Sequence, residues 1–287
     1  MATITAQMVK DLREKTGAGM MDCKKALVAV DGDETKAVDW LRQKGMAKAA
    51  TKSGRATAEG LVCVAESADG KTTALASLYC ETDFVARGDK FQAEAKKIAQ
   101  AVVEKDPADQ AALEALLGDE VKQLIATVGE NMKIGAFARH AKANTQEALG
   151  TYIHSNGKIG VLVWAELGDQ KNCQADVTKT LLRELAMQIA ATNPMALNAD
   201  GVDPKAVEHE RQVYIDKARA EGKPEQIVAK IAEGAVAKFK KSVCLLDQPY
   251  IRDDKKTVND VIKEAAKELS DTVRVLGYHR IQLSAEE

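Results

Sequence analysis

The sequence LVCVAESADGKTTALASLYC, residues 61–80, decides the fold class of this chain. Residues 61–65 and 73–79 are rich in the apolar residues typical of strands, and the turn sequence Ala68-Asp69-Gly70-Lys71 lies between them. A turn of this kind between two apolar runs is typical of a β-hairpin. A charged loop and an amphipathic segment, residues 90–103, come next, and this segment predicts a helix. The stretch therefore predicts an α+β unit.

The same order of elements occurs a second time along the chain. Residues 150–155 and 159–167 are strand-like and flank the turn Asn156-Gly157-Lys158, and residues 176–191 have helical periodicity. The repeat lies in the order of elements and not in residue identity. It predicts two related α+β core subdomains.

The residues before the first hairpin predict three short helices. Thr5 and Asp33 are suited to cap the first and third helices, and the sequence Thr16-Gly17-Ala18-Gly19 separates the first from the second, residues 20–30. Residues 44–60 are small and polar and predict a helix end that runs into a flexible linker. We therefore expect a helical module with its linker over residues 1–54, a first core subdomain over 55–144 and a second over 145–287.

A helical hairpin is predicted inside the second subdomain, at about residues 203–241. Asp203-Pro204 is a typical helix start, Gly222 ends the first helix, and Pro224 begins the second. The expected seam joins Val207, Tyr214 and Ala218 to Ile227, Ile231, Ala235 and Phe239. A strand at 242–246, a helix at 257–269 and a strand at 273–283 are expected to complete the subdomain, so the hairpin is predicted to be a projecting insertion.

Composition and charge exclude several classes of protein. The 287 residues carry 41 basic and 43 acidic side chains, a net charge of −2, which argues against a general polyanion binder. No apolar run approaches the ~18 residues that cross a bilayer, and the first residues do not resemble a secretion signal, so a cytoplasmic location is expected. Five scattered cysteines and four widely spaced histidines predict neither a disulfide framework nor a metal site.

The sequence predicts no catalytic set. Gly17-Ala18-Gly19 resembles the start of a nucleotide-binding loop, but Asp22 replaces the third glycine and a helix precedes it. Cys80 is followed by Glu81 and Asp83, whose negative charges disfavour a thiolate, so a buried strand cysteine is expected rather than a nucleophile.

Two apolar spots are candidates for a protein-binding surface. Met20 and Met21 follow a glycine-rich turn, and either at least one of them faces outward or both complete the small core. Phe84 lies in a loop that follows a strand, and either it packs on the next helix or it stays exposed for a partner.

The chain resembles the elongation factor Ts family in these same segments. The matching segments are TGAGMMDCKKAL at 16–27, TDFVA at 82–86, GEN at 129–131, and His154 with IGVLV at 159–163. The resemblance extends over nearly the whole chain and implies a small three-helix (UBA-like) module, a two-part α+β core and a projecting helical hairpin. The chain stops at Glu287, so a contact made by the further terminal helix of some family members is not carried over.

The resemblance implies a nucleotide exchange factor, not an enzyme, that acts on the GTPase elongation factor Tu. Docking on the partner is implied for Arg13, Met20, Met21, Val128, Gly129 and His154. A wedge that disturbs the partner's magnesium and phosphate site is implied for Thr82, Asp83, Phe84 and Val85. No cofactor, metal, nucleic acid or membrane is expected to bind this chain itself, while self-association or a higher-order complex stays open.

An alternative from a different class is a scaffold or RNA-associated protein. It would use the helical module together with the basic residues Arg42, Lys44, Lys48, Lys52 and Arg55. Between Arg42 and Arg55 no acidic residue interrupts this short basic patch.

Overall fold

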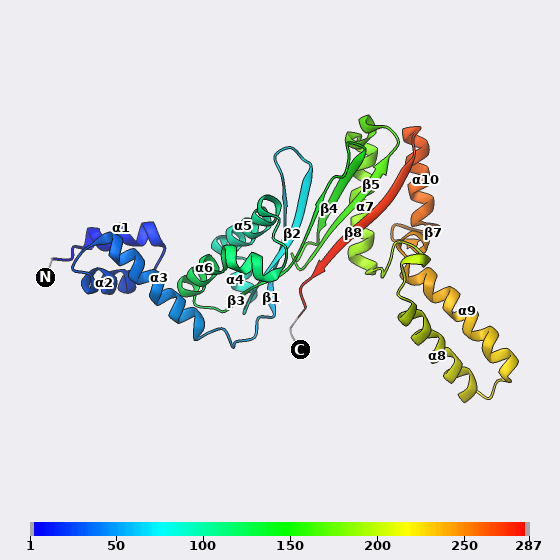
Figure 1. Ribbon diagram of the computed structural model, residues 1–287, viewed down its shortest axis with the longest axis horizontal. Coiled ribbons are helices and arrows are strands. Elements are labelled where there is room, and N and C mark those ends of the chain that lie inside the picture. Colours follow the sequence, from blue (N-terminus) through cyan, green and yellow to red (C-terminus); the bar gives the residue numbers. More distant parts are fainter. Residues whose placement is uncertain (1–2, 285–287) are drawn as a thin grey trace. The chain divides into compact units, whose positions relative to one another are not determined.

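The computed structural model describes residues 3–284 and confirms the α+β fold class (Figure 1). By its internal packing the chain divides into two compact units. The first comprises Met1–Ala141, Ser155–Gly160 and Ile281–Glu287, and the second comprises Lys142–His154 and Val161–Arg280. This division keeps the helical module with the first sheet, and the boundaries expected at residues 54 and 144 stay predictions. Among the described residues, no helix is long and apolar enough to cross a membrane.

The helical module consists of α1 (Ala6–Thr16), α2 (Met20–Ala29) and α3 (Glu34–Ala50). The predicted caps are confirmed, since Thr5 accepts a hydrogen bond from the Met8 amide and Asp33 accepts one from the Lys36 amide. Gly17 ends α1 at φ 67°, a left-handed conformation that glycine adopts without strain. The three helices bury a small apolar core that is centred on Leu12 and Leu27.

A three-stranded antiparallel sheet follows in the first unit. Its strands are β1 (Glu59–Glu66), β2 (Thr72–Cys80) and β3 (Met132–Ala141), with β2 in the centre. Helix α5 (Asp89–Lys105) packs on β1 and β2, and α6 (Gln110–Val128) packs on β3 and on α3. The hairpin and α5 were predicted, whereas α6 and β3 were not.

The second unit contains the repeat of this arrangement. Strands β4 (Glu147–Ile153), β5 (Ile159–Leu167) and β8 (Val273–Gln282) form a sheet in that order, with α7 (Asp176–Thr192) packed on β4. Helix α10 (Val258–Leu269) packs on α7. The capping box that Thr257 forms with Asp260 fixes the start of α10. The predicted hairpin-plus-helix order is therefore present in both units.

In the second unit one prediction is wrong and one small sheet was missed. Residues 242–246 do not form a strand, because α9 continues to Val243 and a 3-10 turn, Leu245–Asp247, follows it. An apolar run this short does not distinguish a strand from a buried helix end by its periodicity. A small sheet of β6 (Pro249–Tyr250) and β7 (Asp253–Thr257) was not predicted.

The predicted helical hairpin is formed by α8 (Pro204–Ala220) and α9 (Glu225–Val243), which pack against each other and extend from the sheet of the second unit (Figure 1). The seam differs by one position from the predicted one. Val228, Ala232 and Val236 are buried on α9, while Ile227 is exposed. At the base, Val207 and Phe239 pack on a separate buried cluster of Ala196, Val202 and Cys244.

Replacing residues 209–237 with a short Gly-Ser turn is expected to leave the rest of the chain folded, because the buried residues removed contact chiefly one another. The variant keeps Val207 and Phe239, which cover the base cluster. Thermal unfolding followed by circular dichroism is expected to show one cooperative transition within a few degrees of the parent chain. A matched deletion that also removes Val207 and Phe239 is expected to be clearly less stable. Loss of cooperative unfolding in the first variant would show that the hairpin is integral to the fold.

Candidate protein-binding site

Phe84 lies on a single helical turn, α4 (Asp83–Ala86), directly after β2. Phe84 was expected in a loop, but the structure has a short helical turn there, which the Thr82 hydroxyl caps by accepting from the Val85 amide at 3.4 Å. Ala86 is buried in the core and Val85 packs against it, whereas Phe84 is 82% exposed. The alternative in which Phe84 packs on the next helix is therefore excluded.

Glu130 holds the start of this turn. Its carboxylate accepts from the Thr82 amide at 3.0 Å and from the Thr82 hydroxyl at 2.7 Å. Glu130 directly follows Gly129, whose left-handed conformation at φ 93° ends α6. The structure thus brings Thr82, Asp83, Phe84 and Val85 close to the turn of Val128 and Gly129. No sequence pattern predicted the hydrogen bonds between Glu130 and Thr82, although Glu130 lies in the segment 129–131 that carries the family resemblance.

Asp83 is already paired on its own turn. Its carboxylate lies 2.8 Å from the Arg87 guanidinium, and the side chain of Arg87 is largely exposed while that of Asp83 is about half exposed. An exposed pair of this kind contributes at most about 1 kcal/mol. A partner can therefore compete for either member at low cost, so the negative charge of Asp83 remains available for recognition.

Cys80 is a buried strand cysteine, as predicted, and not a nucleophile. Its side chain is inaccessible to solvent, and its thiol donates to the Thr82 carbonyl at 3.2 Å. Burial, reinforced by the negative charge of Glu130, raises the pKa of Cys80 from 9.0 to about 12. Because the pKa of Cys80 is higher in the folded chain than in the unfolded chain, the unfolded chain loses this proton first as the pH rises. The contribution of Cys80 to the free energy of unfolding is therefore fully present below pH 9 and declines as the pH rises towards 12.

In the native chain, iodoacetamide at pH 8 is expected to alkylate the partly exposed Cys63 well before Cys80. Peptide mass mapping of timed samples measures the two rates, and the unfolded chain serves as the control in which both react alike. Labelling of native Cys80 as fast as Cys63 would contradict the burial that we assign to this strand end.

Met20 and Met21 form the second apolar spot. They begin α2 and are 46% and 64% exposed, so both face outward and the alternative that places both in the core is excluded. Arg13 is exposed on α1, one turn before the glycine-rich break. Two exposed methionines on one short helix provide an adaptable apolar surface for a protein partner.

The other predicted site residues lie in different surroundings. Val128 packs partly buried against the core of the first unit, and Gly129 offers its carbonyl to the Lys52 ammonium group. His154 belongs to the second unit, where it is exposed and its Nδ1 lies 3.0 Å from the Tyr152 hydroxyl. The role of each in partner binding stays a prediction.

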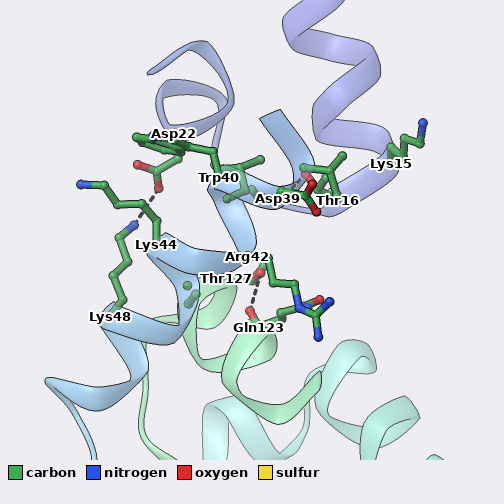
Figure 2. A pocket seen from close by; sticks show the side chains of 16 residues that line it. Lys15, Thr16, Asp22, Asp39, Trp40, Arg42, Lys44, Lys48, Gln123 and Thr127 are labelled. Atoms are coloured by element: carbon green, nitrogen blue, oxygen red, sulfur yellow. Dashed lines mark hydrogen bonds and ion pairs between the residues drawn. The ribbon is translucent and has the colours of Figure 1, made fainter. Parts of the chain in front are cut away.

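A concavity of about 320 Å³ with both polar and apolar lining residues lies between the helical module and α6 (Figure 2). Figure 2 shows Lys48 and Asp22 pointing toward one another, and their charged groups are 2.8 Å apart. At the same site Lys44 lies over the Trp40 ring at 5.2 Å. Outside the concavity's lining, Asp119 of α6 pairs with Arg42 at 3.0 Å. The Lys48–Asp22 and Arg42–Asp119 pairs join α3 to α2 and α6. Among the described residues that line the concavity, Lys15, Arg42, Lys44 and Lys48 are all engaged, which leaves no cluster of unengaged cations there for an anionic ligand.

The comparisons with known proteins agree with this fold. The family model described as elongation factor TS matches residues 81–283. A protein of Desulfovibrio desulfuricans named elongation factor Ts is 64% identical over the full length of both chains. Proteins of the same name from Nitratidesulfovibrio vulgaris and Lawsonia intracellularis are 53% and 43% identical, over 99% of this chain and 96% and 100% of their own.

These matches define the class of protein as a translation elongation factor. The chain belongs to the elongation factor Ts family.

Proposed function

We propose that this chain binds elongation factor Tu in its GDP-bound form and promotes release of the GDP. The exposure of Phe84 is the observation that carries the proposal, because a fixed helical turn presents a large aromatic side chain to solvent. Such a side chain gains apolar burial only when a partner covers it. Thr82, Asp83, Phe84 and Val85 are assigned to the wedge that disturbs the partner's magnesium and phosphate site.

Docking is assigned to Arg13, Met20 and Met21 in the helical module, residues 1–54, and to Val128, Gly129 and His154 in the core. The exposed methionines support the first assignment, since they offer apolar area at a distance in sequence from the wedge. In this proposal the nucleotide and magnesium are held by the partner. The chain performs no covalent chemistry and acts only through differential binding.

The energetics of such a factor follow from linkage. If the chain binds the nucleotide-free partner more tightly than the GDP-bound partner, it must weaken GDP binding by the same factor. A coupling free energy of about 4 kcal/mol corresponds to roughly a thousandfold change in nucleotide affinity. One buried aromatic side chain supplies about half of this coupling, and the remaining contacts must supply the rest.

The contacts of the basic residues do not favour the alternative function, in which this chain is an RNA-associated protein. Arg42, Lys48 and Arg55 pair with acidic side chains, and Lys52 donates to a main-chain carbonyl. The acidic partners Asp119, Asp22 and Glu81 offset the local positive charge that a phosphate backbone requires.

The experiment that tests the proposal is release of fluorescent GDP from elongation factor Tu, followed by stopped flow with excess unlabelled GDP. The release rate is expected to rise with the concentration of this chain and then to saturate. A rate that stays at its spontaneous value over the whole titration would contradict the proposed function.

A further inference from the structure

Two adjacent residues, Glu130 and Asn131, join three segments that are distant in sequence. The Glu130 carboxylate accepts two hydrogen bonds from Thr82, while Asn131 is tied both to Glu81, beside Thr82, and to residues 53–55. The Asn131 amide donates to the Glu81 carboxylate at 2.6 Å, and its side chain donates to the carbonyls of Arg55 at 2.7 Å and Ser53 at 3.4 Å. The linker predicted to be flexible is therefore held at residues 53–55.

These contacts fix Glu130 on both sides. Gly129 ends α6 in a conformation that suits glycine, and Asn131 is 7% exposed with its amide and side-chain donors engaged. Breaking a buried hydrogen bond of this kind leaves an unsatisfied polar group at a cost of about 1–3 kcal/mol. The main chain that carries Glu130 therefore has little freedom to move, and the carboxylate is held at a set position.

Helix α4 needs an external support of this kind. A helix of four residues is far below the length at which helices are stable in water. Its orientation therefore depends on its two anchors, which are the buried Ala86 at its end and Thr82 at its start. Of these, Thr82 is held by Glu130 through both its amide and its hydroxyl.

We infer that Glu130 is a positioning residue for exchange, which sets the direction in which Phe84 projects toward the partner. This inference rests on the proposed function. Glu130 acts through Thr82 and Phe84 and need not touch the partner, so its loss affects the step that uses Phe84 rather than the docking step. Misplacing a group that must enter a defined site costs rate even when the overall contact is retained.

The test is a double-mutant cycle of Glu130→Ala and Phe84→Ala in the GDP-release titration. For Glu130→Ala we expect the maximal release rate to fall about tenfold, with the half-saturating concentration changed less than about twofold. The double variant is expected to be no slower than Phe84→Ala alone, because both changes act on the same side chain. If the double variant lost the product of the two single rate losses, or if Glu130→Ala released GDP at the wild-type rate, the inference would be overturned.

Three further variants separate positioning from general stability. Glu130→Gln keeps an acceptor for the amide and a donor for the hydroxyl, so it is expected to restore most of the rate. Glu130→Asp withdraws the carboxylate by one methylene and is expected to resemble Glu130→Ala, which keeps the cycle testable if the alanine variant fails to fold. Glu114→Ala, which changes an exposed glutamate on α6, is the matched control with a wild-type rate.

The failure of this inference is distinguishable from the failure of the proposed function. If the unmodified chain does not accelerate GDP release, the proposed function fails. If the unmodified chain accelerates release and Glu130→Ala does so equally well, only the positioning role of Glu130 is wrong.

Discussion

Replacing Phe84 by alanine is expected to lower the maximal rate of stimulated GDP release by about 30-fold, with the fold unchanged. Burying a phenylalanine side chain contributes about 2 kcal/mol, and each 1.4 kcal/mol corresponds to a tenfold change. In the free chain this side chain is 82% exposed, so the substitution removes almost no internal packing. The measurement is the stopped-flow titration together with thermal unfolding of the same preparation.

A matched control for Phe84→Ala is Leu116→Ala. Leu116 is an exposed apolar residue on α6 of the same unit, and it has no assigned role in exchange. Its replacement is expected to leave both the melting temperature and the release rate unchanged. If Phe84→Ala also releases GDP at the full rate, the wedge has no part in the mechanism.

Replacing both Met20 and Met21 by aspartate is expected to weaken binding to elongation factor Tu by about 100-fold. Each side chain loses roughly 1.4 kcal/mol of apolar burial at the interface, and the new charges must also be desolvated there. The fold is expected to survive, because both side chains are exposed and an acidic residue at a helix N-terminus is favourable. At a saturating concentration the maximal release rate is expected to recover, since the wedge is intact.

The control for the methionine variant lies on the same helix. Val28 on α2 is 56% exposed, and Val28→Asp is expected to bind the partner with unchanged affinity. Isothermal titration calorimetry measures all three affinities. If the wild-type chain and the methionine variant bound elongation factor Tu with equal affinity, the docking role proposed for Met20 and Met21 would be wrong.

Local signals in the sequence predicted the elements whose ends are marked by capping or turn residues. Thr5 and Asp33 were recognised as caps, and the turn at Asn156-Gly157 was recognised from its Asn-Gly sequence, which suits the positive φ of 71° that Gly157 adopts. The helix α6 was missed although Leu113, Leu117, Val121 and Ile125 recur every four residues and are all buried. That spacing is a signal that the sequence offers and that would have found the helix.

Other features depend on tertiary contacts and have no local signal. Strand β3 contains alanine, glycine and arginine, and its position follows from pairing with β2. On α9 the burial of Val228 in place of Ile227 is decided by the facing helix α8, since both residues are apolar and adjacent. The sequence predicted the residues of the candidate site, but the hydrogen bond that the Thr82 amide donates to Glu130 joins positions 48 residues apart and has no local signal.

The central claim is that this chain distinguishes the nucleotide-free form of elongation factor Tu from its GDP-bound form. The most direct measurement is the affinity of the chain for elongation factor Tu by calorimetry, once without nucleotide and once with saturating GDP and magnesium. The account predicts an affinity roughly a thousandfold weaker in the presence of GDP, because linkage requires the same factor in both directions. Equal affinities under the two conditions would contradict it, since a ligand that binds both forms equally shifts neither.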